Sequence, residues 1–122
     1  MTWFERTYAV TPADRLSQVI ALGFDAAVLE TWAALAAGAT LVLADDELRL
    51  DPSAFARWLV DERVTIACTP TAIGEALLDQ AWPAETSLRV VYLGGERLTR
   101  RPDARTPFRV DNCYGPSSRR CR

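Results

Sequence analysis

Short apolar runs of strand length alternate with segments of helical periodicity, and this alternation constrains the fold more than any other feature of the chain. Strands are expected over residues 16–22, 39–44, 64–68, 88–93 and 108–111. Apolar side chains recur at helical spacing within residues 26–36, 52–63 and 71–78. Repeated strand–helix–strand units with right-handed crossovers make a parallel sheet covered by helices. We therefore expect an α/β fold with three layers, in which a mostly parallel sheet of about five strands carries helices on both faces.

Capping residues predict where the helices begin and end. Asp51 places a carboxylate before Pro52, which suits the first position of a helix. Thr71 is expected to cap the helix that follows it. Gly38 is expected to end the helix that precedes it.

The apolar pattern also predicts which segments are buried. The run from Ala39 to Ala44 is continuous, as in strands of a parallel sheet that is covered on both faces. Trp32 and Trp58 fall at core-facing positions of their helices. By contrast, the segment from Arg97 to Pro107 holds four arginines and two prolines, which predicts an irregular charged loop. A phosphate-binding cluster is the alternative for these arginines, but no glycine-rich cradle or helix start frames them.

Two missing residue types exclude several chemistries. The chain has no histidine, and all 14 of its basic residues are arginines. A Ser-His-Asp triad, a histidine-ligated metal and a lysine Schiff base are therefore excluded. The three cysteines show no C-x-x-C spacing, which argues against a zinc site and against a secreted disulfide framework.

Charge and apolar content indicate the compartment and the partners. The formal net charge of −2 mixes both signs along the chain, so nucleic acid is not an expected partner. The residues after Met1 do not resemble a signal peptide, and no apolar run is long enough to cross a bilayer. We expect a cytoplasmic location and no membrane partner.

Polar and small residues follow the ends of the expected strands, where ligands of parallel sheets bind. These positions are Asp25, Cys68 to Thr71, Tyr92 to Glu96, and Asn112 to Ser117. Each also has a structural explanation. An aspartate at a strand-to-helix turn is commonly an N-cap, and a free cysteine is commonly a small buried side chain. Paired glycines and an Asn-x-Tyr-Gly-Pro segment are common in turns.

Three motifs, in their order and spacing, resemble the adenylation domain of nonribosomal peptide synthetases. They are Gly23-Phe24-Asp25-Ala26-Ala27-Val28-Leu29-Glu30, Gly94-Gly95-Glu96 and Asn112-Cys113-Tyr114-Gly115-Pro116-Ser117. The resemblance covers residues 11–117 and implies one flavodoxin-like α/β subdomain there. Residues 1–10 would form an N-terminal lead-in, and residues 118–122 a tail outside the family pattern.

The resemblance implies adenylyl transfer, in which ATP and an amino acid give aminoacyl-AMP and pyrophosphate before thioester transfer to a carrier protein. Asp25 would hold the substrate α-ammonium group. The wall around the substrate side chain would consist of Asp25, Ala26, Leu29, Cys68, Tyr92, Gly94 and Cys113. Nucleotide-binding residues would be Gly95, Glu96, Asn112, Cys113, Tyr114 and Ser117. Because the wall lacks a partner for a charged side chain, a hydrophobic amino acid is favoured.

Departures from the family pattern imply that the chain is a central fragment, inactive alone, with no catalytic or metal-binding residue of its own. It lacks the Ser/Thr/Gly-rich phosphate loop and any lysine, and Ser118 replaces the glutamate that helps to hold Mg²⁺. The segment after Glu96 is also shorter than is common in the family. ATP and Mg²⁺ would bind in the intact domain, whose remaining parts are expected partners of this chain.

Two alternatives remain open at this stage. An acyl- or aryl-CoA ligase belongs to the same superfamily, but Asp25 argues against it because such an acid has no ammonium group. A scaffold module that keeps the fold without the catalytic segments is the other alternative.

Overall fold

A five-stranded parallel sheet organises the part of the chain that the computed structural model describes, residues 3–19, 25–94 and 96–113. Its strands are β1 (Arg15–Gln18), β2 (Thr40–Leu43), β3 (Ile66–Pro70), β4 (Val90–Gly94) and β5 (Arg109–Cys113). They lie in the order β2-β1-β3-β4-β5, and every neighbouring pair is parallel. This is the flavodoxin-like order: β2 is added on one side of β1, and β3, β4 and β5 are added in turn on the other side. The predicted α/β fold is confirmed.

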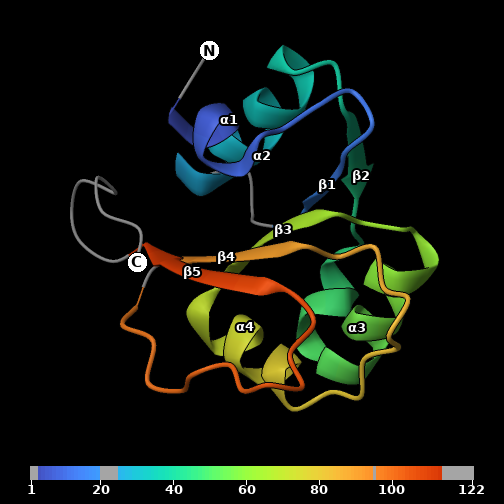
Figure 1. Cartoon of the computed structure of the whole chain (residues 1–122), viewed down its shortest axis with the longest axis vertical. Helices are drawn as coiled ribbons and strands as arrows, with labels where there is room; N and C mark the ends of the chain where they lie inside the picture. Colours follow the sequence, from blue (N-terminus) through green and yellow to red (C-terminus); the bar gives the residue numbers. More distant parts are fainter. Residues whose placement is uncertain (1–2, 20–24, 95, 114–122) are drawn as a thin grey trace.

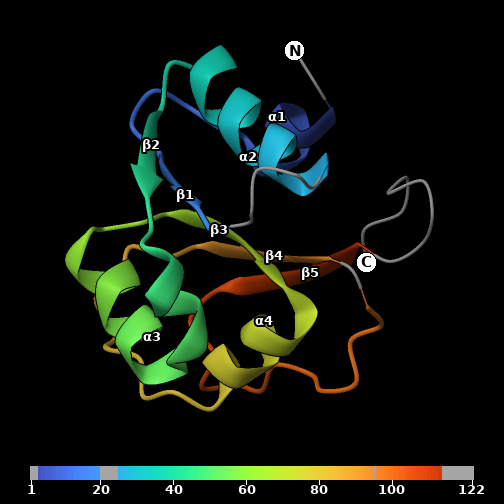
Figure 2. The ribbon, with the colours of Figure 1, turned by 180° about the vertical axis from the view of Figure 1, so that it is seen from behind.

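Helices cover both faces of the sheet, as Figures 1 and 2 show from opposite sides. One face carries α1 (Trp3–Tyr8) and α2 (Asp25–Ala36), and the other carries α3 (Pro52–Asp61) and α4 (Thr71–Leu78). A short 3-10 helix, η1 (Asp46–Leu50), leads into α3. Each face has its own apolar core. Tyr8, Ala33 and Ala34 belong to the core under α1 and α2, whereas Phe55, Leu59 and Leu77 belong to the core under α3 and α4.

Strand register brings three strands to the same edge of the sheet. Pro70 of β3 pairs with Gly94 of β4, and Gly94 pairs with Cys113 of β5. The carboxyl ends of these strands therefore lie side by side. At the opposite edge of the sheet, where the strands begin, Arg89 and Asp14 form an ion pair with an N–O distance of 2.9 Å.

Two predicted helix boundaries are confirmed. The Asp51 carboxylate accepts hydrogen bonds from the backbone amides of Ser53 and Ala54 at 3.1 and 3.2 Å, which is the capping geometry expected before Pro52. Gly38 follows α2 with a φ angle of +71°, a conformation in which glycine avoids the steric cost of a side chain.

Three local expectations are wrong. Trp32 is 62% exposed, because α2 buries the side that carries Glu30, Ala33 and Ala34 and not the side that carries its large apolar residues. β2 is not covered on both faces: it is an edge strand, and Leu43 is 69% exposed. Thr71 does not cap α4; its hydroxyl bonds to the backbone after β4.

The remaining loops agree with the sequence pattern in part. Among the described residues from Glu96 to Phe108 there is no helix or strand, as predicted for the charged segment. Trp58 packs against the core beside Phe55, with ring centroids 5.9 Å apart. The helices α1 and η1 were not predicted, because each is a single short element with little apolar periodicity.

Candidate functional site

The site is built on the face of the sheet that α2 covers, close to the carboxyl ends of β3, β4 and β5. Cys68, Tyr92 and Asp111 occupy neighbouring positions of the three strands, because Cys68 pairs with Tyr92 and Tyr92 pairs with Asp111. All three side chains are buried. Successive strand residues point to opposite faces, so Gly94 lies on the same face as Tyr92, two residues closer to the edge.

Asp111 is a buried carboxylate on this face of the sheet, beside Tyr92. Its Oδ2 accepts a hydrogen bond of 2.8 Å from the Tyr8 hydroxyl. Arg109 donates to both oxygens, through Nε at 2.8 Å and Nη2 at 2.7 Å. The same guanidinium lies 5.3 Å from the centre of the Tyr8 ring, in cation–π contact. Asp111 is therefore already neutralised by neighbours from α1 and β5.

Burial keeps the hydroxyl and thiol groups of this face in their neutral forms. Burial, and then the charges of Cys68 and Asp111, together raise the pKa of Tyr92 to about 12. Burial together with the hydrogen bond to Asp111 raises the pKa of Tyr8 well above its usual range. Burial, and then the Glu30 carboxylate, raise the pKa of the Cys68 thiol. The Cys68 thiol therefore stays protonated and is not a thiolate nucleophile.

Glu30 is a second buried carboxylate, and it connects α2 to the end of β1. Its side chain is 2% exposed, and its two oxygens accept the Val19 amide at 3.1 and 3.3 Å. Gln18 Nε2 lies 3.4 Å from Oε2. These bonds hold Glu30 of α2 (Asp25–Ala36) against the end of β1 and the residue that follows it.

The predicted side-chain wall is described only in part. Cys68, Tyr92 and Gly94 share one face of the sheet, and the backbone of Cys113 pairs with Gly94. Asp25, Ala26 and Leu29 belong to α2, which covers that face. The side chains of Asp25, Ala26, Leu29 and Cys113 lie outside the described residues.

Two members of the predicted nucleotide set, Glu96 and Asn112, meet beyond the end of β4. The Thr71 hydroxyl lies 2.9 Å from the Glu96 carbonyl oxygen and 3.2 Å from that of Gly94. Asn112 Nδ2 donates to the Glu96 carbonyl at 3.1 Å. The structure therefore brings Glu96 and Asn112 together, while Gly95, Tyr114 and Ser117 lie outside the described residues.

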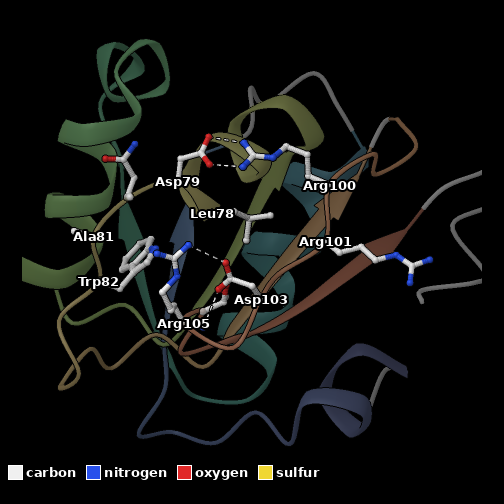
Figure 3. A pocket seen from close by; sticks show the side chains of 10 residues that line it. Leu78, Asp79, Ala81, Trp82, Arg100, Arg101, Asp103 and Arg105 are labelled. Atoms are coloured by element: carbon white, nitrogen blue, oxygen red, sulfur yellow. Dashed lines mark hydrogen bonds and ion pairs between the residues drawn. The ribbon is translucent and has the colours of Figure 1, made fainter.

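A cavity of about 580 Å³ lies elsewhere, between the end of α4 and the charged loop (Figure 3). Its arginines are mostly paired: Arg100 with Asp79, and Arg105 with Asp103 at 3.2 Å. Arg101 points away from both pairs. The prediction of a solvated charged loop, and not of a phosphate cluster, agrees with this arrangement.

Sequence analysis missed four residues of the site, for three different reasons. Tyr8 and Asp111 form a pair over 103 positions of sequence, which no local pattern reveals. Glu30 was quoted within a motif but given no role, although a carboxylate on the buried side of a helix signals a specific partner. The role of Thr71 was missed because capping was the simpler explanation.

A family model described as "AMP-binding enzyme" matches residues 1–117. Linear gramicidin synthase subunits C and B of Brevibacillus parabrevis are 44% and 42% identical over 94% and 96% of this chain. Surfactin synthase subunit 2 of Bacillus subtilis is 31% identical over 94% of this chain. The chain spans only 2–3% of the length of these relatives.

Solved structures of nonribosomal peptide synthetases share the fold. The AMPPNP-bound form of FmoA3 superposes with a TM-score of 0.80 at 32% identity, over 92% of this chain and 13% of that chain. The form described as bound to alpha-methyl-L-serine-AMP gives a TM-score of 0.79 at 33% identity, over 93% and 14% of the two chains.

The described residues offer neither a metal-binding cluster nor a membrane-spanning helix. No group of three or more Cys, Asp or Glu side chains among them is arranged to hold a metal ion. None of the helices in the described ranges combines the length and apolarity that crossing a membrane requires.

Proposed function

This chain belongs to the AMP-binding enzyme family, and from that premise we propose that it is the substrate-specifying segment of an adenylation domain that activates an amino acid in nonribosomal peptide synthesis. Residues 11–117 would form the α/β subdomain, with residues 1–10 as a lead-in and residues 118–122 outside the family pattern. The intact domain would convert ATP and an amino acid to aminoacyl-AMP and pyrophosphate.

The observation that carries this proposal is that three residues of the predicted wall share one face of the sheet. Cys68, Tyr92 and Gly94 come from two strands, yet alternation and register place them on the face under α2. The helix α2 begins at Asp25, at the carboxyl edge, where ligands of parallel sheets bind. Together these elements would form one side of a pocket with Asp25 at its mouth.

Asp25 would accept the α-ammonium group of the substrate in a charge-assisted hydrogen bond. The alternative role, an N-cap of α2, uses the same carboxylate oxygens. Exclusion of water by the neighbouring side chains would make the ion pair stronger than it is in solution. Ala26, Leu29 and Cys113 complete the proposed wall.

A hydrophobic amino acid suits the described part of this wall. The two buried carboxylates nearby are already engaged: Asp111 by Arg109 and Tyr8, and Glu30 by Val19 and Gln18. A charged substrate side chain would lack a free partner among these groups, and burying it would be costly. Tyr92 offers a neutral ring and hydroxyl instead.

Glu96 and Asn112, with Gly95, Cys113, Tyr114 and Ser117, would line the nucleotide side of the site. ATP would be the second substrate, and in the reaction a substrate carboxylate oxygen bonds to the α-phosphorus while the bond to pyrophosphate breaks. The rest of the domain would supply the phosphate loop and a lysine, and a carrier protein would receive the aminoacyl group. Catalysis would then consist chiefly of positioning and charge neutralisation.

Mg²⁺ would accompany ATP in the intact domain. The described residues offer no acidic cluster for it, and Ser118, where a glutamate is expected, lies outside them. We therefore assign no metal ligand to this chain. We also expect the isolated chain to bind ATP weakly at best and to catalyse no turnover.

The role of Asp25 gives the sharpest test. Residues 11–117 are placed in a complete adenylation domain, and amino-acid-dependent ATP–pyrophosphate exchange is compared with and without Asp25→Asn. If the carboxylate holds the ammonium group, Asp25→Asn reduces kcat/KM for the amino acid by about a hundredfold, as expected when a buried charge pair is broken. Unchanged kinetics would support the N-cap role alone.

Two alternative functions are tested in the same assay. For an acyl- or aryl-CoA ligase, exchange would depend on an acid without an amino group and would tolerate Asp25→Asn. For a scaffold module, the grafted domain would fold but support no exchange.

A further inference from the structure

Two side chains from different elements meet at the backbone of Glu96. Thr71 is the first residue of α4, and Asn112 lies in β5. The Thr71 hydroxyl donates to the Glu96 carbonyl at 2.9 Å and accepts from the Glu96 amide at 3.3 Å. Asn112 donates to the same carbonyl at 3.1 Å, so both polar groups of the Glu96 backbone are bonded to side chains.

The contacts of Asn112 extend this arrangement along the chain. Its Oδ1 accepts the Leu98 amide at 3.3 Å while its Nδ2 serves Glu96. The Thr71 hydroxyl also reaches the Gly94 carbonyl at 3.2 Å, and Thr71 is 3% exposed. Backbone groups in a segment without a helix or strand need partners of this kind to keep one conformation.

We propose that Thr71 and Asn112 are positioning residues that clamp the backbone around Glu96 in the conformation that receives the nucleotide. This inference rests on the proposed function, in which Gly95 and Glu96 border ATP. The clamp fixes the segment before ATP arrives, so binding does not have to order it. The two bonds use one N–H and one lone pair of the Asn112 carboxamide, so the clamp leaves Asn112 able to border the nucleotide as well.

The first test measures amide hydrogen exchange on the chain itself. Thr71→Val keeps the shape of the side chain and removes its hydroxyl, whereas Thr71→Ser keeps the hydroxyl. We expect Thr71→Val to speed exchange of the Glu96 amide about tenfold relative to the Leu93 amide in β4, and Thr71→Ser to restore protection. Equal rates at Glu96 in all forms would overturn the clamp.

Thr65→Val is the matched control. The Thr65 hydroxyl donates to Asp14 Oδ1 at 2.7 Å at the opposite edge of the same sheet. Its loss is expected to lower stability without a selective change at Glu96. If Thr65→Val and Thr71→Val change the hydrogen-exchange rate of the Glu96 amide equally, Thr71 has only a structural role and the proposal is overturned.

The second test measures KM for each substrate in the complete adenylation domain that carries residues 11–117. Thr71→Val is expected to raise KM for ATP about tenfold and to change KM for the amino acid less than twofold, whereas Thr71→Ser restores KM for ATP. Equal changes in both KM values would overturn the proposal. If the Glu96 amide is protected from hydrogen exchange but the unsubstituted domain shows no ATP–pyrophosphate exchange, the proposed function is contradicted and the clamp is still supported.

Discussion

Asp14 shows at the residue scale how one buried carboxylate joins distant parts of the chain. Its oxygens accept from the Thr11 amide at 2.9 Å, the Thr65 hydroxyl at 2.7 Å and the Arg89 guanidinium at 2.9 Å. Burial opposes the charged form, but the hydrogen bonds from Arg89, Thr11 and Thr65 lower the pKa of Asp14 below its ordinary value. The charged carboxylate is therefore the form that stabilises the fold.

This lowered pKa predicts a pH dependence of stability. A group whose pKa is lower in the folded state stabilises the protein fully above its unfolded-state pKa, and the contribution is lost as pH falls through the folded-state pKa. We expect Asp14→Asn to lower the free energy of unfolding by about 2 kcal/mol at pH 7, and the difference from the native chain to shrink below about pH 4. Urea unfolding over this pH range measures it. A difference that stays constant down to pH 2 would contradict the assignment.

Glu30 predicts a second effect at this scale. Glu30→Ala leaves the buried Val19 amide without its acceptor, so we expect a loss of about 1–3 kcal/mol in the free energy of unfolding. Glu30→Gln retains an acceptor oxygen and should cost less. Urea unfolding measures the loss in the free energy of unfolding. Hydrogen exchange of the Val19 amide shows whether the loss arises at that hydrogen bond. Equal losses for Ala and Gln would show that charge, and not the Val19 bond, is what matters.

At the scale of elements, α4 and β4 fit together through a glycine. A Cβ atom built on Gly74 would lie 1.9 Å from Leu93 Cδ2. Alanine favours a helix over glycine by about 1 kcal/mol, but overpacking typically costs about 1–3 kcal/mol. We therefore expect Gly74→Ala to lower the thermal midpoint despite its better helix propensity.

A double-mutant cycle identifies the cause of that loss. If the contact with Leu93 is responsible, Gly74→Ala combined with Leu93→Ala will be less destabilising than the sum of the two single changes. Additive losses would show that the helix backbone, and not the packing against β4, sets the requirement for glycine.

Periodicity predicted the elements of this fold better than it predicted which of their faces are buried. The strands and α2, α3 and α4 follow from local pattern, and the Asp51 cap from one dipeptide. The burial of α2 could not be predicted, because the helix turns Glu30, Ala33 and Ala34 inward and leaves Trp32 exposed. The Thr71 clamp likewise depends on where the segment after β4 lies, which only tertiary structure sets.

At the scale of the whole molecule, α2 presents an apolar stripe. Val28, Trp32 and Leu35 recur at helical spacing and are 55%, 62% and 54% exposed. Exposed apolar patches of this kind drive association. We expect the chain to self-associate at micromolar concentration, and the double substitution Trp32→Glu with Leu35→Glu to make it monomeric with little change in unfolding free energy. Sedimentation velocity over a concentration series measures this, and a native chain that is monomeric throughout would contradict it.

The small share of a synthetase that this chain covers also limits what it can do alone. The chain covers 13% of the FmoA3 chain that it superposes on, so the proposed activity depends on parts of a domain beyond these 122 residues. We propose that these residues determine the choice of amino acid and form one wall of the nucleotide site. That assignment is separable from catalysis and can be tested separately.

The most direct test places residues 11–117 in a complete adenylation domain of known preference and measures ATP–pyrophosphate exchange over a panel of amino acids. We expect the preference to shift from that of the host to a different, hydrophobic amino acid. An active chimera that keeps the preference of its host would contradict the claim that this segment holds the specificity pocket.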